Sequence, residues 1–169
     1  KTSAKKLISL RPTEPMLEKV LNLAEKESYK DILEHFDSAQ KKINVSILKL
    51  IENKDVIFTH CHSTNVINAL IYAKKKGKKF EVYNTETRPL FQGRKTAVEL
   101  KKAGIKVTMF IDSAAAIVLE RENKKDKTYS NIVFLGADAL LNNGIINKIG
   151  SGMVAELATP NKIPVYILA

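Results

Sequence analysis

Residues 55–73, DVIFTHCHSTNVINALIYA, decide the fold of this 169-residue chain. The apolar run Asp55–Thr59 predicts a short buried strand, and Asn65–Ala73 has the spacing of an amphipathic helix. Between them lies Cys61, the single cysteine, with a histidine on each side. A strand that turns directly into a helix places this thiol beside free backbone N–H groups, which lower a thiol's pKa and attract anions. Cys61 is therefore either a reactive thiol or a buried structural cysteine.

Short apolar runs and amphipathic segments alternate from Asp55 to the end of the chain. This alternation predicts an α/β fold, a Rossmann-like parallel sheet with helices on both faces. Glycines close two of the helices, at Gly77 and Gly104. The predicted strands are 55–60, 79–84, 105–111, 131–135 and 164–168; the predicted helices are 65–76, 92–103, 113–119 and 147–157, with a turn-rich insert at 121–130 and a loop at 136–144.

Residues 1–53 are predicted to form an N-terminal helical arm. From Pro15 to about Asn53 the apolar residues recur at helical spacing, in one short and one longer helix. Arg11-Pro12-Thr13 is typical of an extended lead into a helix cap. We expect residues 54–169 to form the Rossmann-like domain, truncated at its C-terminus. The chain does not start with Met and ends on a strand-like run, so we expect either a fragment or a naturally short relative.

Composition narrows the class of protein. A hydrophobic content of 44% suffices for a core, and no apolar run approaches the length of a transmembrane helix. One cysteine cannot form an internal disulfide, which fits a cytoplasmic protein. The net charge of +10 suggests anionic partners, such as nucleic acid, phosphorylated metabolites or an acidic protein. Most lysines fall near predicted helix ends, where they complement the helix dipole, so charge alone does not choose among these partners.

Polar residues interrupt each apolar run at its carboxyl end. They are Cys61, the segment Thr85–Arg88, Asp112-Ser113 and Asp138. Because parallel sheets bind ligands outside the carboxyl ends of their strands, we expect these residues to share one site. No GxGxxG fingerprint for a dinucleotide is present. If the strand pleat continues, the histidines beside Cys61 point to opposite sides, so no metal site is expected.

Each further candidate has a structural alternative. Asp138 is either a turn cap or a carboxylate, enclosed beside the thiol with a raised pKa, that transfers protons. Arg88 either clamps a phosphate or forms a surface ion pair with Glu86. Asn147-Lys148 at a predicted helix start is either an anion cradle or ordinary capping.

Five motifs, in order, resemble one superfamily. It comprises the regulatory subunits of eukaryotic initiation factor 2B, methylthioribose-1-phosphate isomerase and ribose-1,5-bisphosphate isomerase. The resemblance covers nearly the whole chain, and Arg11–Thr13 is similar to that family's lead into its helical arm. The motifs are Thr59–Thr64 (THCHST), Thr85–Arg94 (TETRPLFQGR), Asp112–Ala115 (DSAA), Gly136–Asp138 (GAD) and Asn147–Gly150 (NKIG).

The isomerase branches, the ribose-1,5-bisphosphate type above all, resemble this chain more than the regulatory subunits do, because the latter usually lack the cysteine. The resemblance implies that Cys61 and Asp138 are the catalytic pair. His62 stands where isomerases usually have asparagine, and the family's Arg-Gly phosphate loop would precede Arg11. The substrate-binding residues that the resemblance implies are Ser63, Thr64, Arg88, Gln92, Gly93, Asn147 and Lys148.

The implied function is an aldose–ketose isomerase, an intramolecular oxidoreductase that converts ribose 1,5-bisphosphate to ribulose 1,5-bisphosphate without metal or organic cofactor. The carbonyl would move from C1 to C2 through an enediolate or a hydride shift. The alternatives are a regulatory subunit in translation initiation, which binds a nucleotide or sugar phosphate and an initiation-factor partner without catalysis, and a catalytically dead assembly domain. The resemblance also implies a homo-oligomer, dimer or hexamer, with no membrane partner.

Overall fold

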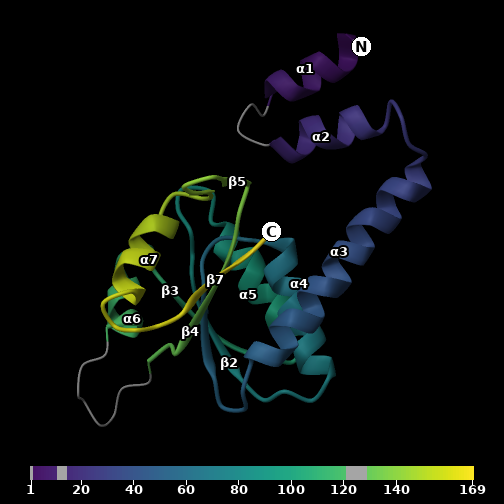
Figure 1. The fold of residues 1–169 in the computed structure, drawn as a ribbon. Helices are drawn as coiled ribbons and strands as arrows, with labels where there is room; N and C mark the ends of the chain where they lie inside the picture. Colours follow the sequence, from purple (N-terminus) through teal and green to yellow (C-terminus); the bar gives the residue numbers. More distant parts are fainter. Residues whose placement is uncertain (1, 11–14, 121–128) are drawn as a thin grey trace.

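The structure is a computed structural model that describes residues 2–10, 15–120 and 129–169. Its centre is a parallel five-stranded sheet with the order β3-β2-β1-β4-β7 (Figure 1). The predicted Rossmann-like sheet is confirmed. The strands are β1 (Val56–Thr59), β2 (Glu81–Thr85), β3 (Lys106–Phe110), β4 (Ile132–Gly136) and β7 (Val165–Leu168).

Strand order reverses beside β1. The chain builds β2 and β3 on one side of β1 and then returns to place β4 on the other side. The first turns after β1 and β4 therefore diverge and leave a crevice above the carboxyl ends of these two strands. This topology places the segment after β1, which contains Cys61, opposite the segment after β4, which contains Asp138.

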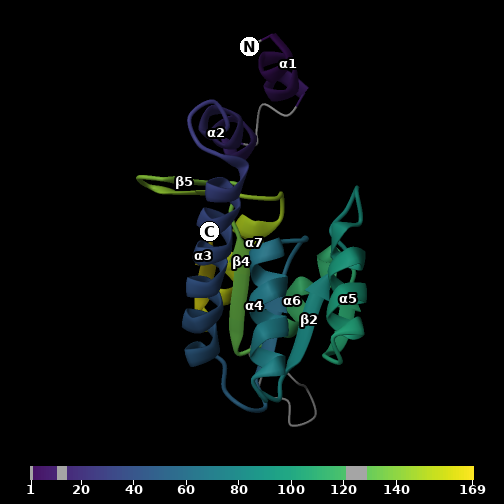
Figure 2. The ribbon, with the colours of Figure 1, turned by 90° about the vertical axis from the view of Figure 1, so that its right-hand side faces the viewer.

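Helices cover both faces of the sheet, as Figures 1 and 2 show. Side chains of β1 alternate between two cores: Ile57 packs with α3 and α4, and Phe58 packs with α6 and α7. Both side chains are fully buried, and each burial contributes about 2–3 kcal/mol. The helices are α3 (Tyr29–Leu50), α4 (Thr64–Lys75) and α5 (Gln92–Lys102) on one face, and α6 (Ala115–Leu119) and α7 (Ser151–Ala158) on the other.

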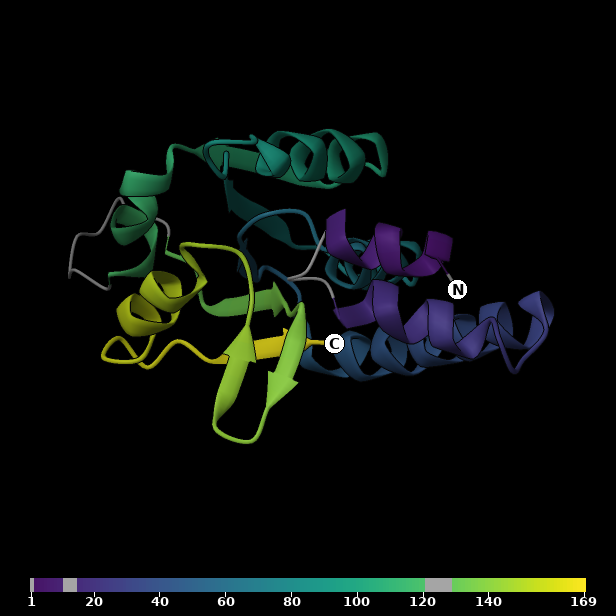
Figure 3. The ribbon, with the colours of Figure 1, turned by 90° about the horizontal axis from the view of Figure 1, so that it is seen from above.

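Three helices precede β1. The arm contains α1 (Thr2–Leu10), which the sequence analysis did not predict, α2 (Pro15–Leu23) and α3. Figure 1 shows α1 and α2 above the sheet and beyond the start of α3, and in the view from above both helices lie across the region of α3 (Figure 3). The end of α3 belongs to the α/β core, because Ile47 and Ile51 are buried there, so the boundary proposed after residue 53 follows a helix that both parts share. The motif Arg11-Pro12-Thr13 lies outside the described residues.

Two predictions between β4 and β7 are wrong. The expected loop at 136–144 contains an antiparallel hairpin, β5 (Ala139–Leu141) and β6 (Gly144–Ile146), because apolar pairs flank an Asn-Asn-Gly turn. The expected helix at 147–157 starts later, at Ser151, because Gly150 has a left-handed φ of 100°.

The expected helix at 113–119 begins with a 3₁₀ turn, Asp112–Ala114. Residues 121–128 of the predicted insert lie outside the described residues.

Within the described residues, no helix combines the length and the apolar character needed to cross a bilayer.

Replacement of Gly93 by alanine should destabilise the fold. A Cβ at this buried position would lie 1.7 Å from the backbone oxygen of Thr85, so α5 would have to move away from β2. We expect Gly93→Ala to lower the free energy of unfolding by about 3 kcal/mol. Denaturant unfolding followed by circular dichroism measures the loss.

Gly152→Ala is the matched control, because a Cβ at Gly152 meets nothing within 4 Å. This exposed helical position should gain about 0.5 kcal/mol from the higher helix propensity of alanine. Equal stability of Gly93→Ala and the wild type would contradict the described packing of α5 on β2.

Candidate functional site

A cleft of ≈ 480 Å³ opens at the carboxyl edge of the sheet, at the crevice between β1 and β4. It brings together the predicted site residues Cys61, Ser63, Thr64, Gln92, Asp138, Asn147 and Lys148, which come from four separate segments of the chain. Met16 of α2 and Leu90 also line it. Arg88 and Gly93 are not among the residues that line the cleft.

Cys61 adopts a left-handed backbone conformation, with a φ of 69°. A residue with a Cβ pays about 1–2 kcal/mol for this conformation. Two threonines hold it: the Cys61 N–H donates to Thr87 Oγ1 at 2.9 Å, and Thr96 Oγ1 donates to the Cys61 carbonyl at 2.8 Å. The chain therefore leaves the strand pleat at Cys61, so the condition under which His60 and His62 would point to opposite sides does not hold.

The expectation of a lowered thiol pKa is also wrong. Burial raises the pKa of Cys61 above its ordinary value, Asp138 adds to the rise, and the His62 backbone N–H and Lys148 oppose it. The start of α4 has fewer free backbone N–H groups than the sequence suggested, because the Ser63 side chain already accepts the Val66 N–H. Cys61 is thus a neutral thiol at neutral pH, and its Sγ–H points to Gln92 Oε1 at 3.6 Å.

His60 is a part of the site that the sequence analysis did not assign. The residue is 2% exposed. Nδ1 pairs with the Thr85 hydroxyl, and Nε2 lies 2.8 Å from the Ile149 carbonyl. Burial is the main cause of a lowered His60 pKa; Lys148 lowers the pKa further, and the Ile149 carbonyl and Asp112 oppose it. Because a carbonyl only accepts, the neutral ring donates from Nε2 and accepts at Nδ1.

The His60 ring supports the segment that contains Asn147 and Lys148. Gly150 passes directly over it, and a Cβ there would lie 2.8 Å from His60 Nε2. A polar residue at the end of a fully buried strand was the signal in the sequence, since such a side chain needs partners that only the folded chain provides.

The hairpin positions Asp138 and its neighbours at the cleft. The Asp138 N–H donates to the Ile146 carbonyl at 2.8 Å, which closes the base of the hairpin next to Asn147 and Lys148. The Asp138 carboxylate is exposed in the cleft and is not enclosed as expected. Asn147 Nδ2 donates to Ser151 Oγ at 2.9 Å, so this side chain links the cleft to the start of α7. The N-cap of α7 is Gly150, which has no side-chain cap hydrogen bond.

The β2–α5 turn holds Arg88 and Gly93 away from the cleft. Arg88 Nη1 lies 3.6 Å from Glu86 Oε1, as in the ion-pair alternative, and its guanidinium lies over the Phe91 ring. Arg94 pairs with the same carboxylate at 3.0 Å. Gly93 is buried and lets α5 approach β2 closely.

The described residues contain no group of three or more His, Cys, Asp or Glu side chains that could hold a metal. His62 instead lies 3.4 Å from Glu99 on α5.

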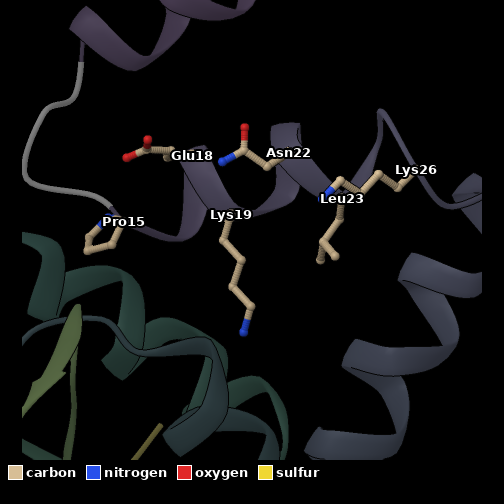
Figure 4. A pocket seen from close by; sticks show the side chains of 6 residues that line it. All are labelled: Pro15, Glu18, Lys19, Asn22, Leu23 and Lys26. Carbon is tan, nitrogen blue, oxygen red and sulfur yellow. The ribbon is translucent and has the colours of Figure 1, made fainter.

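A second hollow, of ≈ 360 Å³, lies along α2. Figure 4 shows Lys19 and Leu23 extending from this helix on the same side. Residues of α2 and of the turn after it line this hollow, without a thiol or imidazole, so the chemical groups converge at the carboxyl edge.

Comparison with known proteins shows the family to which the chain belongs. The Initiation factor 2 subunit family matches residues 3–169. The chain is 38% identical to ribose 1,5-bisphosphate isomerase of Thermococcus kodakarensis over 83% of this chain and 41% of that protein. It is 36% identical to methylthioribose-1-phosphate isomerase of Fervidobacterium nodosum over 90% of this chain and 44% of that protein.

Solved structures of this group share the fold. The translation initiation factor eIF-2B of Pyrococcus horikoshii OT3 matches with a TM-score of 0.74 and 28% identity, over 81% of this chain and 47% of that one. The tetrameric eIF2B-β2δ2 complex from C. thermophilum matches with a TM-score of 0.69 and 28% identity, over 91% and 45%. The chain thus spans about half the length of these relatives, and it belongs to the initiation factor 2 subunit family.

Proposed function

We propose that this chain provides the catalytic core of an aldose–ketose isomerase that converts ribose 1,5-bisphosphate to ribulose 1,5-bisphosphate. The observation that carries the proposal is the shared cleft of the Cys61 thiol and the Asp138 carboxylate, which reach it from opposite sides of the crevice between β1 and β4. Relatives named ribose 1,5-bisphosphate isomerase support the choice of sugar.

The two groups suit complementary proton transfers. A thiol that stays protonated at neutral pH can donate to the ring oxygen as the C1–O bond opens. The Asp138 carboxylate can accept the proton of the C2 hydroxyl as this carbon becomes a carbonyl. The hydrogen on C2 moves to C1, through an enediolate or as a hydride, so substrate and product are isomers. Transfer of the proton from Asp138 back to Cys61 restores the enzyme.

The rest of the cleft suits an anionic substrate. Lys148 supplies a positive charge, and Ser63 and Thr64 lie at the start of α4, where the helix dipole favours phosphate. Gln92 contacts the thiol and can orient both it and a sugar hydroxyl. Arg88 would reach the substrate only after it leaves Glu86, so its proposed role in binding phosphate requires that ion pair to open.

A regulatory subunit that binds a nucleotide or sugar phosphate without catalysis is the second candidate. The similarity to eIF-2B structures favours it. Turnover of the sugar by the full-length protein decides for the isomerase, and binding of an initiation-factor subunit without turnover decides for the regulator. With either function we propose a homo-oligomer in the cytoplasm. The tetrameric eIF2B-β2δ2 complex from C. thermophilum, which contains two kinds of subunit, supports assembly into an oligomer. The free Cys61 thiol fits a reducing compartment.

Loss of either catalytic group should abolish turnover in the full-length protein. We expect Cys61→Ser and Asp138→Asn each to reduce kcat for ribose 1,5-bisphosphate by about a thousandfold, because each removes one proton-transfer group. Formation of ribulose 1,5-bisphosphate measures the rate. Asp37→Asn, at an exposed position on α3, is the matched control and should retain full activity. Full activity of Cys61→Ser would exclude the proposed mechanism.

The raised pKa of Cys61 predicts two pH effects. Iodoacetamide should modify Cys61 in the native protein with a half-maximal rate above a pH of about 8.5, the ordinary value for a thiol. Because the folded pKa exceeds the unfolded one, stability from the neutral thiol is complete below the unfolded pKa and is lost as pH rises through the folded pKa.

Unfolding experiments at increasing pH should therefore show this loss in the wild type and not in Cys61→Ser. A native alkylation midpoint below that of the denatured chain would contradict the assignment of a neutral thiol.

A further inference from the structure

We infer that Asp112 is a positioning residue for the Cys61 thiol, which it controls through Thr87. The inference rests on the proposed catalytic role of Cys61. Asp112 belongs to a motif that the proposed chemistry does not use, and it follows β3, an edge strand of the sheet. Its effect would thus reach the thiol across two strands.

The first step runs from Asp112 to the turn after β2. The Asp112 carboxylate accepts two backbone N–H bonds, from Thr87 to Oδ1 at 2.8 Å and from Arg88 to Oδ2 at 2.7 Å. Thr87 is fully buried and has a left-handed φ of 61°. A β-branched residue rarely adopts this conformation, so the two bonds from the carboxylate stabilise a backbone that the sequence alone disfavours.

The second step runs from Thr87 to the thiol residue. Thr87 Oγ1 accepts the Cys61 N–H at 2.9 Å and so stabilises the second left-handed residue, Cys61. Asp112, Thr87 and Cys61 follow β3, β2 and β1, which are adjacent strands. Loss of the Asp112 carboxylate should therefore release Thr87, and a released Thr87 lets Cys61 leave its left-handed conformation, which displaces the thiol from its half-buried position in the cleft and exposes it.

The test measures the thiol and the turnover together in the full-length protein. In Asp112→Ala we expect iodoacetamide to modify Cys61 about fivefold faster. This factor corresponds to the loss of one net hydrogen bond, the one from the Cys61 N–H to Thr87 Oγ1. Mass spectrometry of the Cys61 peptide is the readout. We expect kcat to fall about tenfold while KM stays within about twofold, since a misplaced group slows chemistry more than binding. Asp112→Asn, which retains one acceptor oxygen, should have an alkylation rate and a kcat between those of the wild type and Asp112→Ala. This variant carries the test if Asp112→Ala does not fold.

Thr87 variants test the route. Thr87→Val should reproduce both effects, and Thr87→Ser, which keeps the hydroxyl, should restore wild-type values. The double variant of Asp112→Ala and Thr87→Val should add nothing to either single change, because the two residues act in one chain of contacts. Fully additive effects would overturn the inference.

Asp55→Asn is the matched control. Asp55 is buried and, like Asp112, accepts two N–H bonds, from the Glu52 backbone and from Asn131 Nδ2, but it precedes β1 at the opposite edge of the sheet. It should lower stability and leave Cys61 alkylation within about twofold of wild type. Equal alkylation rates in wild type, Asp112→Ala and Asp112→Asn would refute the inference, even if Cys61→Ser abolishes turnover. If no protein turns over the sugar, the alkylation rates still decide.

Discussion

Burial of β1 on both faces is the constraint on which the rest of this structure depends. Ile57 and Phe58 point into opposite cores, so β1 can neither slip by one residue nor move to an edge of the sheet. The strand therefore ends at one defined point, beside the reversal in strand order, and the chain turns there through a left-handed Cys61. The position of the thiol is a consequence of the core.

The carboxyl edge of the sheet works as a connected series of turns. The left-handed residues Cys61, Thr87 and Phe91 all lie there. Side chains of neighbouring segments accept the N–H groups of Cys61 and Thr87, and the Phe91 N–H donates to the Thr87 carbonyl. Such strain persists only where the surroundings hold it firmly. His60 has the corresponding role on the other side of the crevice, since its ring supports the segment with Lys148.

Much of the fold could be predicted because β1 and β4 are continuously apolar and because glycines end α4 and α5. The hairpin β5–β6 was missed because its strands are three residues long and mostly exposed, so they lack a core pattern. The polar residues of the cleft could be placed on one edge, since parallel strands align their carboxyl ends. Two properties depend on contacts between distant residues and could not be read from local sequence: the raised pKa of Cys61 and the partners of the buried His60 ring. The Glu86 ion pair of Arg88 was one of two alternatives that the sequence left open, and the structure contains it.

The decisive measurement is a crystal structure of the full-length Cys61→Ser protein with ribose 1,5-bisphosphate bound. If Cys61 and Asp138 form an acid–base pair, C1 and C2 of the sugar will lie between the side chain at position 61 and the Asp138 carboxylate, with a phosphate near Lys148. A sugar bound outside this cleft, for example in the hollow along α2 that Lys19 and Leu23 line, would contradict the proposed site.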